Sequence, residues 1–424
     1  MLILLPYLAA ATIRQAGAWG YLTLRISDPD QLAVVCALSE GNNFRVSVDP
    51  GPAERLLTNC DAVPTGLWYR VNPDLHLAWK QCHARKDMGI SRTAFRDAVH
   101  SGYQIFGVPH LVLTYAPGVD EAFPDAAVPD LAAWQVGPDG VFPLDILVQP
   151  AATGIAQLDQ HWPVVPLQKA SALLVGAGSI GSATAHALAG YGIGGLVLMD
   201  PDRLSWHNLV RHTSDGRYVG RHKVTALAEE LTRLRPETRV HPLPWDVITQ
   251  ADRVRALLPA VDIVVCTADG VAARRTVSHL SRRAGVTAVL ACVLQDGAIG
   301  EVLRLRPWSR HGCLTCRRRA LVNTGGMDPE PALDAGYGTG TRHRPMTAVG
   351  PDLHLVAHLA AKTAVATVLE RAGHPDQRLP GEHALLALRR QPDFSPPFDL
   401  DRTGDLRWLP ATPPEPGCPT CESP

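Results

Sequence analysis

Along roughly the C-terminal three-fifths of the chain, short apolar runs alternate with longer segments of helical periodicity. Five runs are short and apolar enough for buried strands, near Ala172, Leu196, Val240, Val261 and Val289. Strands that alternate with helices predict a parallel sheet. Two further runs, Ile299–Arg304 and His383–Leu388, predict antiparallel additions. We therefore expect an α/β fold over residues 160–424, a Rossmann-like three-layer domain with a mostly parallel sheet.

The N-terminal third is less regular. Its strand-like runs are Tyr21–Ile26, Leu32–Leu38, Phe44–Val48 and His110–Tyr115. Residues 92–106 predict a helix with Phe95, Val99 and Phe106 broadly on one face. Proline and glycine dominate residues 117–163, which predicts a boundary and linker there. We expect a smaller α+β domain over residues 1–150.

A glycine-rich turn follows the run Leu173–Val175. Gly176 permits a tight turn, Gly178 lets phosphates approach the backbone, and Gly181 lets the next helix pack on the strand. That helix directs free N–H groups and its positive dipole end at an anion. A second strand ends in Asp200, near the spacing of a ribose-binding carboxylate. This pattern predicts a nucleotide-binding unit and by itself favours NAD.

The residues after Asp200 favour ATP instead. A dehydrogenase needs one carboxylate there, whereas this chain adds Asp202, Asn208, Arg211 and Lys223. Two cations and an amide suit a triphosphate, which carries charge that NAD lacks.

A further carboxylate, Asp269, follows the fourth predicted strand. Parallel sheets of this kind bind ligands at the carboxyl ends of their strands. Asp269 is therefore predicted to hold Mg²⁺ on the phosphates.

With these motifs, the segment from Gln168 to the C-terminus resembles the adenylation domain of the ubiquitin-activating-like superfamily, which includes the ThiF and MoeB sulfur-carrier adenylyltransferases. The resemblance implies that Asp200 binds the ribose hydroxyls and Asp202 lines the nucleotide pocket. It also implies that Asn208, Arg211 and Lys223 hold the phosphates, while Asp269 binds magnesium.

The chain departs from the family pattern at two places. His212 stands where many relatives have glutamine, and Thr267-Ala-Asp269 stands where they commonly have Thr-Asp-Asn. Neither departure removes a charged group that the chemistry needs.

The implied activity is ATP-dependent adenylation of a C-terminal carboxylate, with release of pyrophosphate. The substrate would be a ubiquitin-like or sulfur-carrier protein, or a peptide. Arg211, Lys223 and Asp269-bound Mg²⁺ would neutralise charge in the transition state. Family members usually form homodimers, sometimes with an arginine that reaches the partner's site. Arg14 and Arg92 are candidates for that arginine by position only.

Four of the nine cysteines form two Cys-x-x-Cys pairs, Cys313 with Cys316 and Cys418 with Cys421. Two such pairs supply the four thiolates of a structural zinc site. The alternative, two disulfides, requires an oxidising compartment. Zinc sites of this kind recur in the resembled family, so we expect Zn²⁺ here.

The remaining cysteines argue against a thioester. Relatives that form one carry a nucleophilic cysteine in the crossover segment, but residues 317–347 contain none and have the glycine-rich composition of a mobile loop. Cys266 and Cys292 lie in apolar runs and are expected to be inert core residues. Cys82 lies among basic residues that would favour thiolate, although a bystander thiol is the stronger interpretation.

Composition narrows the functional classes. Forty Lys plus Arg balance 41 Asp plus Glu, so no basic excess marks a nucleic-acid binder. The apolar opening, residues 1–10, lacks a basic flank, contains Pro6 and falls short of the roughly 20 residues that span a bilayer. We expect a cytoplasmic protein with no membrane association.

Several alternatives are compatible with the sequence. A non-catalytic protein that presents a leader peptide to another enzyme could keep the same fold, as could a tRNA-directed relative. The N-terminal domain could cover the larger sheet, bind the substrate, or be a ubiquitin-conjugating-type domain.

Two further patterns are expected to be structural. His354 and His358 share a helix face within the apolar segment Leu353–Leu369, but the metalloprotease glutamate is absent. Residues 317–319, three arginines, are expected to be a solvated run beside the zinc pair.

Overall fold

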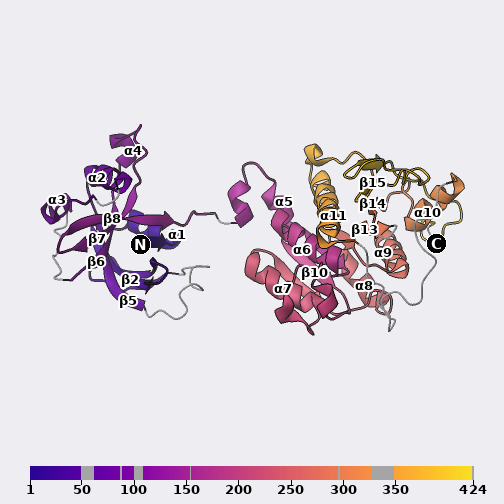
Figure 1. Ribbon diagram of the computed structural model, residues 1–424, viewed down its shortest axis with the longest axis horizontal. Coiled ribbons are helices and arrows are strands. Elements are labelled where there is room, and N and C mark those ends of the chain that lie inside the picture. Colours follow the sequence, from indigo (N-terminus) through magenta and orange to yellow (C-terminus); the bar gives the residue numbers. More distant parts are fainter. Residues whose placement is uncertain are drawn as a thin grey trace. The chain divides into compact units, whose positions relative to one another are not determined.

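The computed structural model describes residues 1–48, 62–85, 88–99, 108–152, 154–294, 297–325 and 348–422. The chain divides into two compact units, Met1–Thr153 and Gly154–Pro424 (Figure 1). Each unit has its own eight-stranded sheet and its own hydrophobic cores.

The larger unit is built on a sheet with the strand order β11-β10-β9-β12-β13-β14-β15-β16. Its strands are β9 (Ser171–Val175), β10 (Gly195–Met199), β11 (Arg239–Leu243), β12 (Ile263–Cys266), β13 (Thr287–Leu294), β14 (Ile299–Leu305), β15 (His383–Ala387) and β16 (Leu406–Leu409). The first five strands in this order, β11, β10, β9, β12 and β13, are parallel, whereas β14, β15 and β16 are antiparallel additions. The predicted fold class is confirmed.

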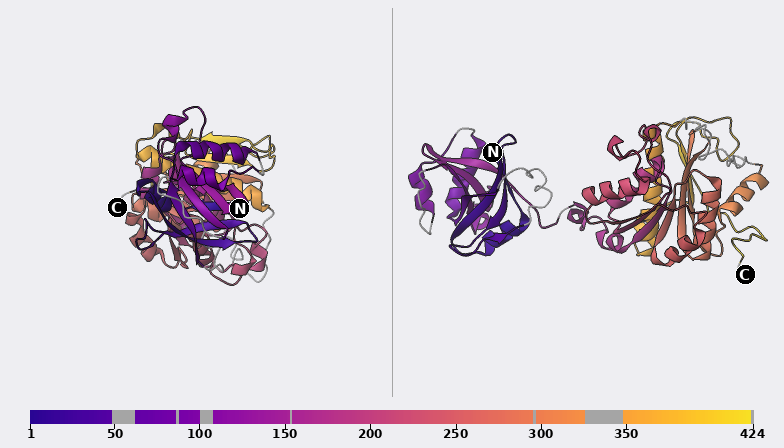
Figure 2. Two further views of the ribbon diagram at one scale, coloured as in Figure 1. Left: turned by 90° about the vertical axis from the view of Figure 1, so that its left-hand side faces the viewer. Right: turned by 90° about the horizontal axis from the view of Figure 1, so that it is seen from below.

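Helices cover both faces of this sheet. They are α5 (Val164–Lys169), α6 (Ser179–Tyr191), α7 (Lys223–Leu234), α8 (Ala251–Leu257), α9 (Val271–Arg283), α10 (Leu314–Asn323) and α11 (Gly350–Arg371). Leu174 and Leu198 point into one core with α6, α7 and α11, while Leu173 and Met199 point into another with α8 and α9. The sheet therefore lies between two helical layers (Figures 1 and 2).

Helix α11 is the long apolar helix that the sequence predicts. Among the described residues it alone has the length and hydropathy of a membrane span, and 67% of its apolar window is buried inside the unit. It packs on α6, β13 and β14. Its composition is accounted for by this packing, because a helix that is apolar on most sides suits the interior of a domain.

The strand order places a ligand site. The chain runs from β9 through β10 to β11 toward one edge of the sheet, and then from β12 to β13 toward the other. Folds of this kind bind ligands at the carboxyl ends of the strands, where the direction switches. Here the switch lies between β9 and β12, and the turns that follow them are residues 176–178 and 267–269.

The smaller unit is a closed sheet. Its strand order is β1-β8-β7-β6-β5-β2-β3-β4, and pairing of β1 with β3 closes it into a barrel. Its strands are β1 (Leu2–Leu5), β2 (Trp19–Ser27), β3 (Leu32–Leu38), β4 (Val46–Ser47), β5 (Ala62–Arg70), β6 (His110–Tyr115), β7 (Leu131–Gly137) and β8 (Gly140–Val148). Its helices are α1 (Tyr7–Gln15), α2 (Pro73–Ala84), α3 (Arg92–Ala98) and α4 (Val119–Ala122). Leu22, Leu24 and Trp68 lie in one core with α1, whereas Tyr69 and Trp134 lie in a second with α2 and α3.

Two predictions for this unit hold only in part, although the boundary between the units, at Thr153 and Gly154, does fall within the predicted boundary region. The stretch 117–163 is not all linker, because it contains the hairpin of β7 and β8. Pro143 is tolerated within β8 because it precedes the part that pairs with β1, so its missing N–H interrupts no ladder there. The predicted helix at 92–106 ends at Ala98 within the described residues, and Phe106 lies outside them.

Candidate active site

The glycine-rich turn has the conformation that its glycines allow. Gly176 has a φ of +91°, and a Cβ there would lie 2.7 Å from the nitrogen of Ala268. At Gly181 a Cβ would lie 1.9 Å from the oxygen of Gly176. At Gly178, in contrast, a Cβ would meet no atom of the described residues within 4 Å. Packing thus requires glycine at positions 176 and 181, while Gly178 faces space that the described residues leave open to a ligand.

Helix α6 begins directly after this turn, with Gly178 at its N-cap and no described side chain capping it. The first N–H groups of a helix need partners from outside the helix and readily bind an anion. The turn itself is fixed, because the Gly176 N–H donates to the oxygen of Met199 (2.8 Å) and the Thr267 hydroxyl donates to the oxygen of Gly176 (2.7 Å).

Asp200 is buried beside the turn. Its Oδ2 accepts the N–H of Ala177 at 2.7 Å, and its Oδ1 accepts the N–H of Asp202 at 2.8 Å. Burial raises the pKa of this carboxyl, against the opposing effects of Lys223 and the two N–H donors. The predicted ribose ligand is therefore held in one orientation.

Lys223 is the first residue of α7, where the helix dipole disfavours a cation. Its ammonium donates to Oδ2 of Asp202 at 2.7 Å. Burial alone would lower the pKa of Lys223, but Asp200, Asp202 and Asp269 together raise it. These carboxylates keep the lysine charged in a buried position.

Asp269 completes the cluster. It lies at the surface just after β12, yet the surrounding protein displaces enough water to raise the pKa of its carboxyl. Lys223, Arg211 and Arg274 act in the opposite direction. The fold thus brings the predicted magnesium ligand together with the predicted phosphate ligands. A desolvated carboxylate beside Asp202 provides the oxygen donors that a divalent cation prefers.

Asn208 organises the loop that carries Arg211. It ends the 3₁₀ helix Trp206–Asn208, and its Oδ1 accepts the N–H (3.1 Å) and the hydroxyl (2.8 Å) of Ser205. Its backbone oxygen accepts the N–H groups of Arg211 (3.0 Å) and His212 (2.9 Å). The predicted phosphate role of Asn208 stays a prediction, whereas this structural role was not foreseen.

The fold and this cluster define a class of protein. A glycine-rich turn at the switch point of a Rossmann-like sheet, joined by cations and carboxylates, is typical of nucleotide-binding α/β proteins. The family model of the ThiF family matches residues 164–390, which is more than half of the chain. The chain belongs to the ThiF family.

Curated relatives match part of the chain. Molybdopterin-synthase adenylyltransferase of Escherichia coli (strain K12) is 36% identical over 110 residues, covering 26% of this chain and 43% of that protein. Sulfur carrier protein ThiS adenylyltransferase of Bacillus subtilis (strain 168) is 30% identical over 159 residues, covering 37% of this chain and 46% of that protein. The matched segments span less than half the length of these relatives.

Solved structures that match part of the chain include E. coli MccB with ATP. It is 20% identical, has a TM-score of 0.44, and the match covers 61% of this chain and 68% of that one. MccB with AMPCPP and MccA matches with a TM-score of 0.45 at 19% identity, over 61% and 68% of the two chains.

The four paired cysteines converge in the larger unit. Their sulfur atoms all lie within 4.8 Å of one another. Cys313 is 3.7 Å from Cys316 and 3.6 Å from Cys418, and Cys316 is 3.7 Å from Cys421. A tetrahedral Zn²⁺ with Zn–S bonds of about 2.3 Å separates its sulfurs by about 3.8 Å, whereas a disulfide needs about 2.05 Å.

Backbone donors also suit thiolates at this cluster. The N–H of Cys313 donates to the sulfur of Cys421, and the N–H of Glu415 donates to the sulfur of Cys316, both at 3.3 Å. The four residues therefore fit a structural zinc ion, which would join the start of α10 to the C-terminal segment.

The three arginines after Cys316 are solvated only in part: Arg319 is exposed, but Arg317 is half-buried and Arg318 is buried, so the predicted solvated run is wrong for these two. They lie on α10, and Arg318 is only 4% exposed. Its guanidinium donates to both oxygens of the buried Glu301, at 2.7 and 2.5 Å. Burial alone would raise the pKa of Glu301, but Arg318 and His383 hold it well below its usual range. Sequence alone could not reveal this, because Glu301 on β14 is distant along the chain.

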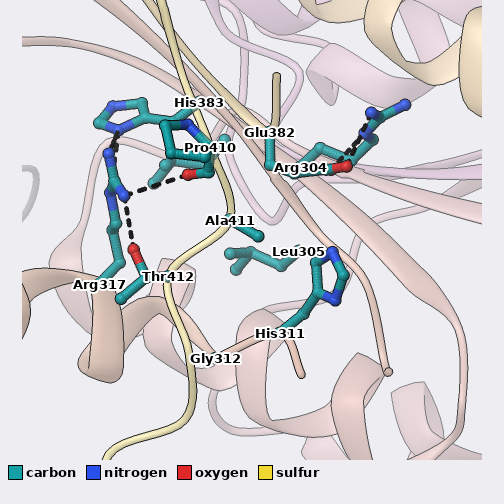
Figure 3. Close-up of a pocket in the computed structure, with 11 residues that line it drawn as sticks. Arg304, Leu305, His311, Gly312, Arg317, Glu382, His383, Pro410, Ala411 and Thr412 are labelled. Carbon is teal, nitrogen blue, oxygen red and sulfur yellow. Dashed lines mark hydrogen bonds and ion pairs between the residues drawn. The ribbon is translucent and has the colours of Figure 1, made fainter. Parts of the chain in front are cut away.

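Arg317 ties α10 to the C-terminal segment, as Figure 3 shows. It donates to Nδ1 of His383 (2.6 Å), the hydroxyl of Thr412 (2.5 Å) and the oxygen of Pro410 (3.4 Å). Since Nδ1 of His383 accepts, its Nε2 carries the proton and donates to Glu301 at 2.9 Å. The cavity beside these residues measures about 20 Å³. It has room for about one water molecule.

The Glu301–Arg318 pair is expected to carry much of the local stability. Glu301→Gln removes one charge and leaves Arg318 buried without its counter-ion, which costs about 3–5 kcal/mol of unfolding free energy. Urea unfolding at pH 7 measures the loss, with the exposed Glu237→Gln as matched control. Because the folded pKa is depressed, the pair's contribution is present above the ordinary pKa of 4.5 and is lost as pH falls below it. Equal stability of the two variants would contradict this role.

The other cysteines differ in their surroundings. Cys266 is fully buried, and burial raises the pKa of its thiol to about 11, as suits an inert core residue. Cys292 is not purely apolar in its contacts, because Nη1 of Arg274 lies 2.6 Å from its sulfur and Glu301 lies 3.6 Å away. Cys82 is buried in the smaller unit. The predicted mobile segment beyond Gly325 lies outside the described residues, up to residue 347.

Proposed function

We propose that the larger unit binds Mg-ATP at the switch point and adenylates a carboxylate. The observation that carries this proposal is a chain of contacts at the switch point: Lys223 pairs with Asp202 at 2.7 Å, and the N–H groups of Asp202 and of Ala177, in the glycine-rich turn, both donate to Asp200. Arg211 and Asp269 lie close enough to this cluster to interact with it electrostatically. NAD needs one carboxylate at this place, whereas a triphosphate with its metal needs cations and a further carboxylate. The adenylyltransferase relatives support the same reaction.

In the proposed reaction, a carboxylate oxygen of the substrate attacks the α-phosphorus of ATP. A new P–O bond forms, the bond from the α-phosphorus to the bridging oxygen breaks, and pyrophosphate leaves. No side chain need act as nucleophile, because the carboxylate is already ionised. Asp200 would hold the ribose, and Asp269 would hold the magnesium. The phosphates would be bound by Asn208, Arg211 and Lys223, with Asp202 beside Lys223.

The substrate we propose is the C-terminus of a ubiquitin-like or sulfur-carrier protein, or of a peptide. Residues 317–347 contain no cysteine, so the adenylate would be consumed without a thioester on that segment. We also propose that the protein is a cytoplasmic homodimer. Arg14, a candidate for the trans-acting arginine by position only, forms an ion pair with Asp130 of its own unit at 2.6 Å.

The proposal is tested by calorimetry with Mg-ATP and with NAD. We expect binding of Mg-ATP, poor binding of NAD, and a loss of roughly tenfold or more in ATP affinity for Lys223→Ala, because a buried ammonium contributes a charge-assisted contact. Arg221→Ala is the matched control, since Arg221 is a nearby cation that pairs with Glu229 on the surface. Absence of ATP binding by the wild-type protein would favour a leader-peptide-binding role.

A further inference from the structure

His212 joins the two phosphate-binding segments of the proposed site. It is 7% exposed and directly follows Arg211. Its Nε2 lies 2.8 Å from the oxygen of Ala177, in the glycine-rich turn, and its Nδ1 accepts the N–H of Ser214 at 3.0 Å. Because Nδ1 accepts, Nε2 must carry the proton and donate to Ala177. The geometry therefore assigns the neutral Nε2–H tautomer.

The surroundings keep this imidazole neutral. Burial lowers the pKa of His212 to about 4, and the nearby Lys223, His186 and His354 also oppose a second proton. A neutral ring can donate at one nitrogen and accept at the other, whereas a protonated ring would lose the bond from Ser214.

Both polar groups of Ala177 are thereby held. Its N–H donates to Asp200 at 2.7 Å, and its carbonyl accepts from His212 at 2.8 Å. The carbonyl of Ala177 and the N–H of Gly178 belong to one planar trans peptide and point in opposite directions. Holding the carbonyl against His212 consequently turns the Gly178 N–H to the other side of the peptide plane. Beside Gly178 the described residues leave open space.

The other side of the Arg211 segment is also held. Nε2 of His354, on α11, lies 3.2 Å from the oxygen of Arg211. A Cβ at Gly350 would lie 3.2 Å from the Cα of Arg211, so α11 packs closely on this backbone. Arg211 thus lies on a segment fixed against both the glycine-rich turn and α11.

We propose that His212 is a positioning residue that orients the Ala177–Gly178 peptide toward the phosphates and sets its spacing from Arg211. This inference rests on the proposed function. It assigns His212 an active part in the site, although the residue carries no charge to the nucleotide.

The test compares two substitutions of similar size. His212→Gln keeps one donor and one acceptor, whereas His212→Leu keeps the bulk and removes both. We expect His212→Leu to weaken Mg-ATP binding about tenfold or more, because the buried Ala177 carbonyl and Ser214 N–H lose their partner. His212→Gln should stay within about threefold of wild type. Adenosine, which has no phosphates, should bind His212→Leu and wild type with similar affinity.

The outcomes separate the two proposals. If wild type binds no Mg-ATP, the proposed function fails and this inference fails with it. If wild type binds ATP but the leucine variant binds it equally well, or the glutamine variant is as weak as the leucine variant, only the role of His212 is overturned. Equal losses for ATP and adenosine would indicate a merely structural residue.

Nitrogen NMR of His212 in the wild-type protein gives an independent measurement of the tautomer, and a proton on Nδ1 at pH 7 would contradict the assignment. Should His212→Leu fail to fold, His212→Asn replaces it, since its shorter amide cannot reach both partners.

Discussion

Replacing Asp269 with alanine is expected to abolish exchange of labelled pyrophosphate into ATP. The exchange reports reversible formation of an acyl-adenylate, so it requires the cognate carboxylate, for which small proteins encoded beside this gene are the first candidates. The loss follows because Asp269 is the carboxylate that would anchor magnesium on the phosphates. Lys223→Ala should slow the exchange about 10²-fold or more, since one donor aimed at developing charge contributes about 3 kcal/mol in a dry site.

The matched control for Asp269 is Asp252→Ala, which removes an exposed carboxylate on α8 with a side chain 93% exposed. It should exchange at the wild-type rate. Asp200→Ala should instead weaken nucleotide binding first, because contacts to the ribose act similarly in the ground and transition states. Exchange that survives Asp269→Ala would mean that magnesium is held by another residue, with Asp202 as the next candidate.

Purified protein is expected to contain about one Zn²⁺ per chain, and Cys421→Ser should lower both the metal content and the melting temperature. Structural zinc sites in small peptides contribute about 10–16 kcal/mol of apparent binding free energy, so loss of one of four ligands has a large effect. In this chain the loss of zinc should destabilise both α10 and the C-terminal segment, because the site joins them. Metal analysis together with thermal unfolding measures both quantities.

Cys36→Ser is the control for this prediction. Cys36 lies on β3 in the smaller unit, where its thiol contacts the oxygen of Thr23 at 3.3 Å. This variant should retain the full zinc content. If wild-type protein that is purified under reducing conditions contains no zinc, the zinc assignment is overturned.

The fold of the larger unit could be predicted largely from the sequence. Its strands are apolar runs such as Leu173–Val175, and buried parallel strands are recognisable because both of their faces are apolar. The smaller unit was less predictable. Its barrel closes by pairing β1 with β3, and the hairpin of β7 and β8 lies in a stretch rich in proline and glycine. Composition reports local backbone preference, whereas strand pairing depends on partners far along the chain.

The same division holds within the site. The sequence by itself determined which charged residues follow each strand, from Asp200 to Asp269, because strand ends converge at one edge of a parallel sheet. Only the tertiary structure decided what contacts them: His212 became a donor to the glycine-rich turn, and Arg318 became the buried partner of Glu301. A residue's charge and spacing are local properties, but its burial, tautomer and partner are set by segments that meet only in the folded chain.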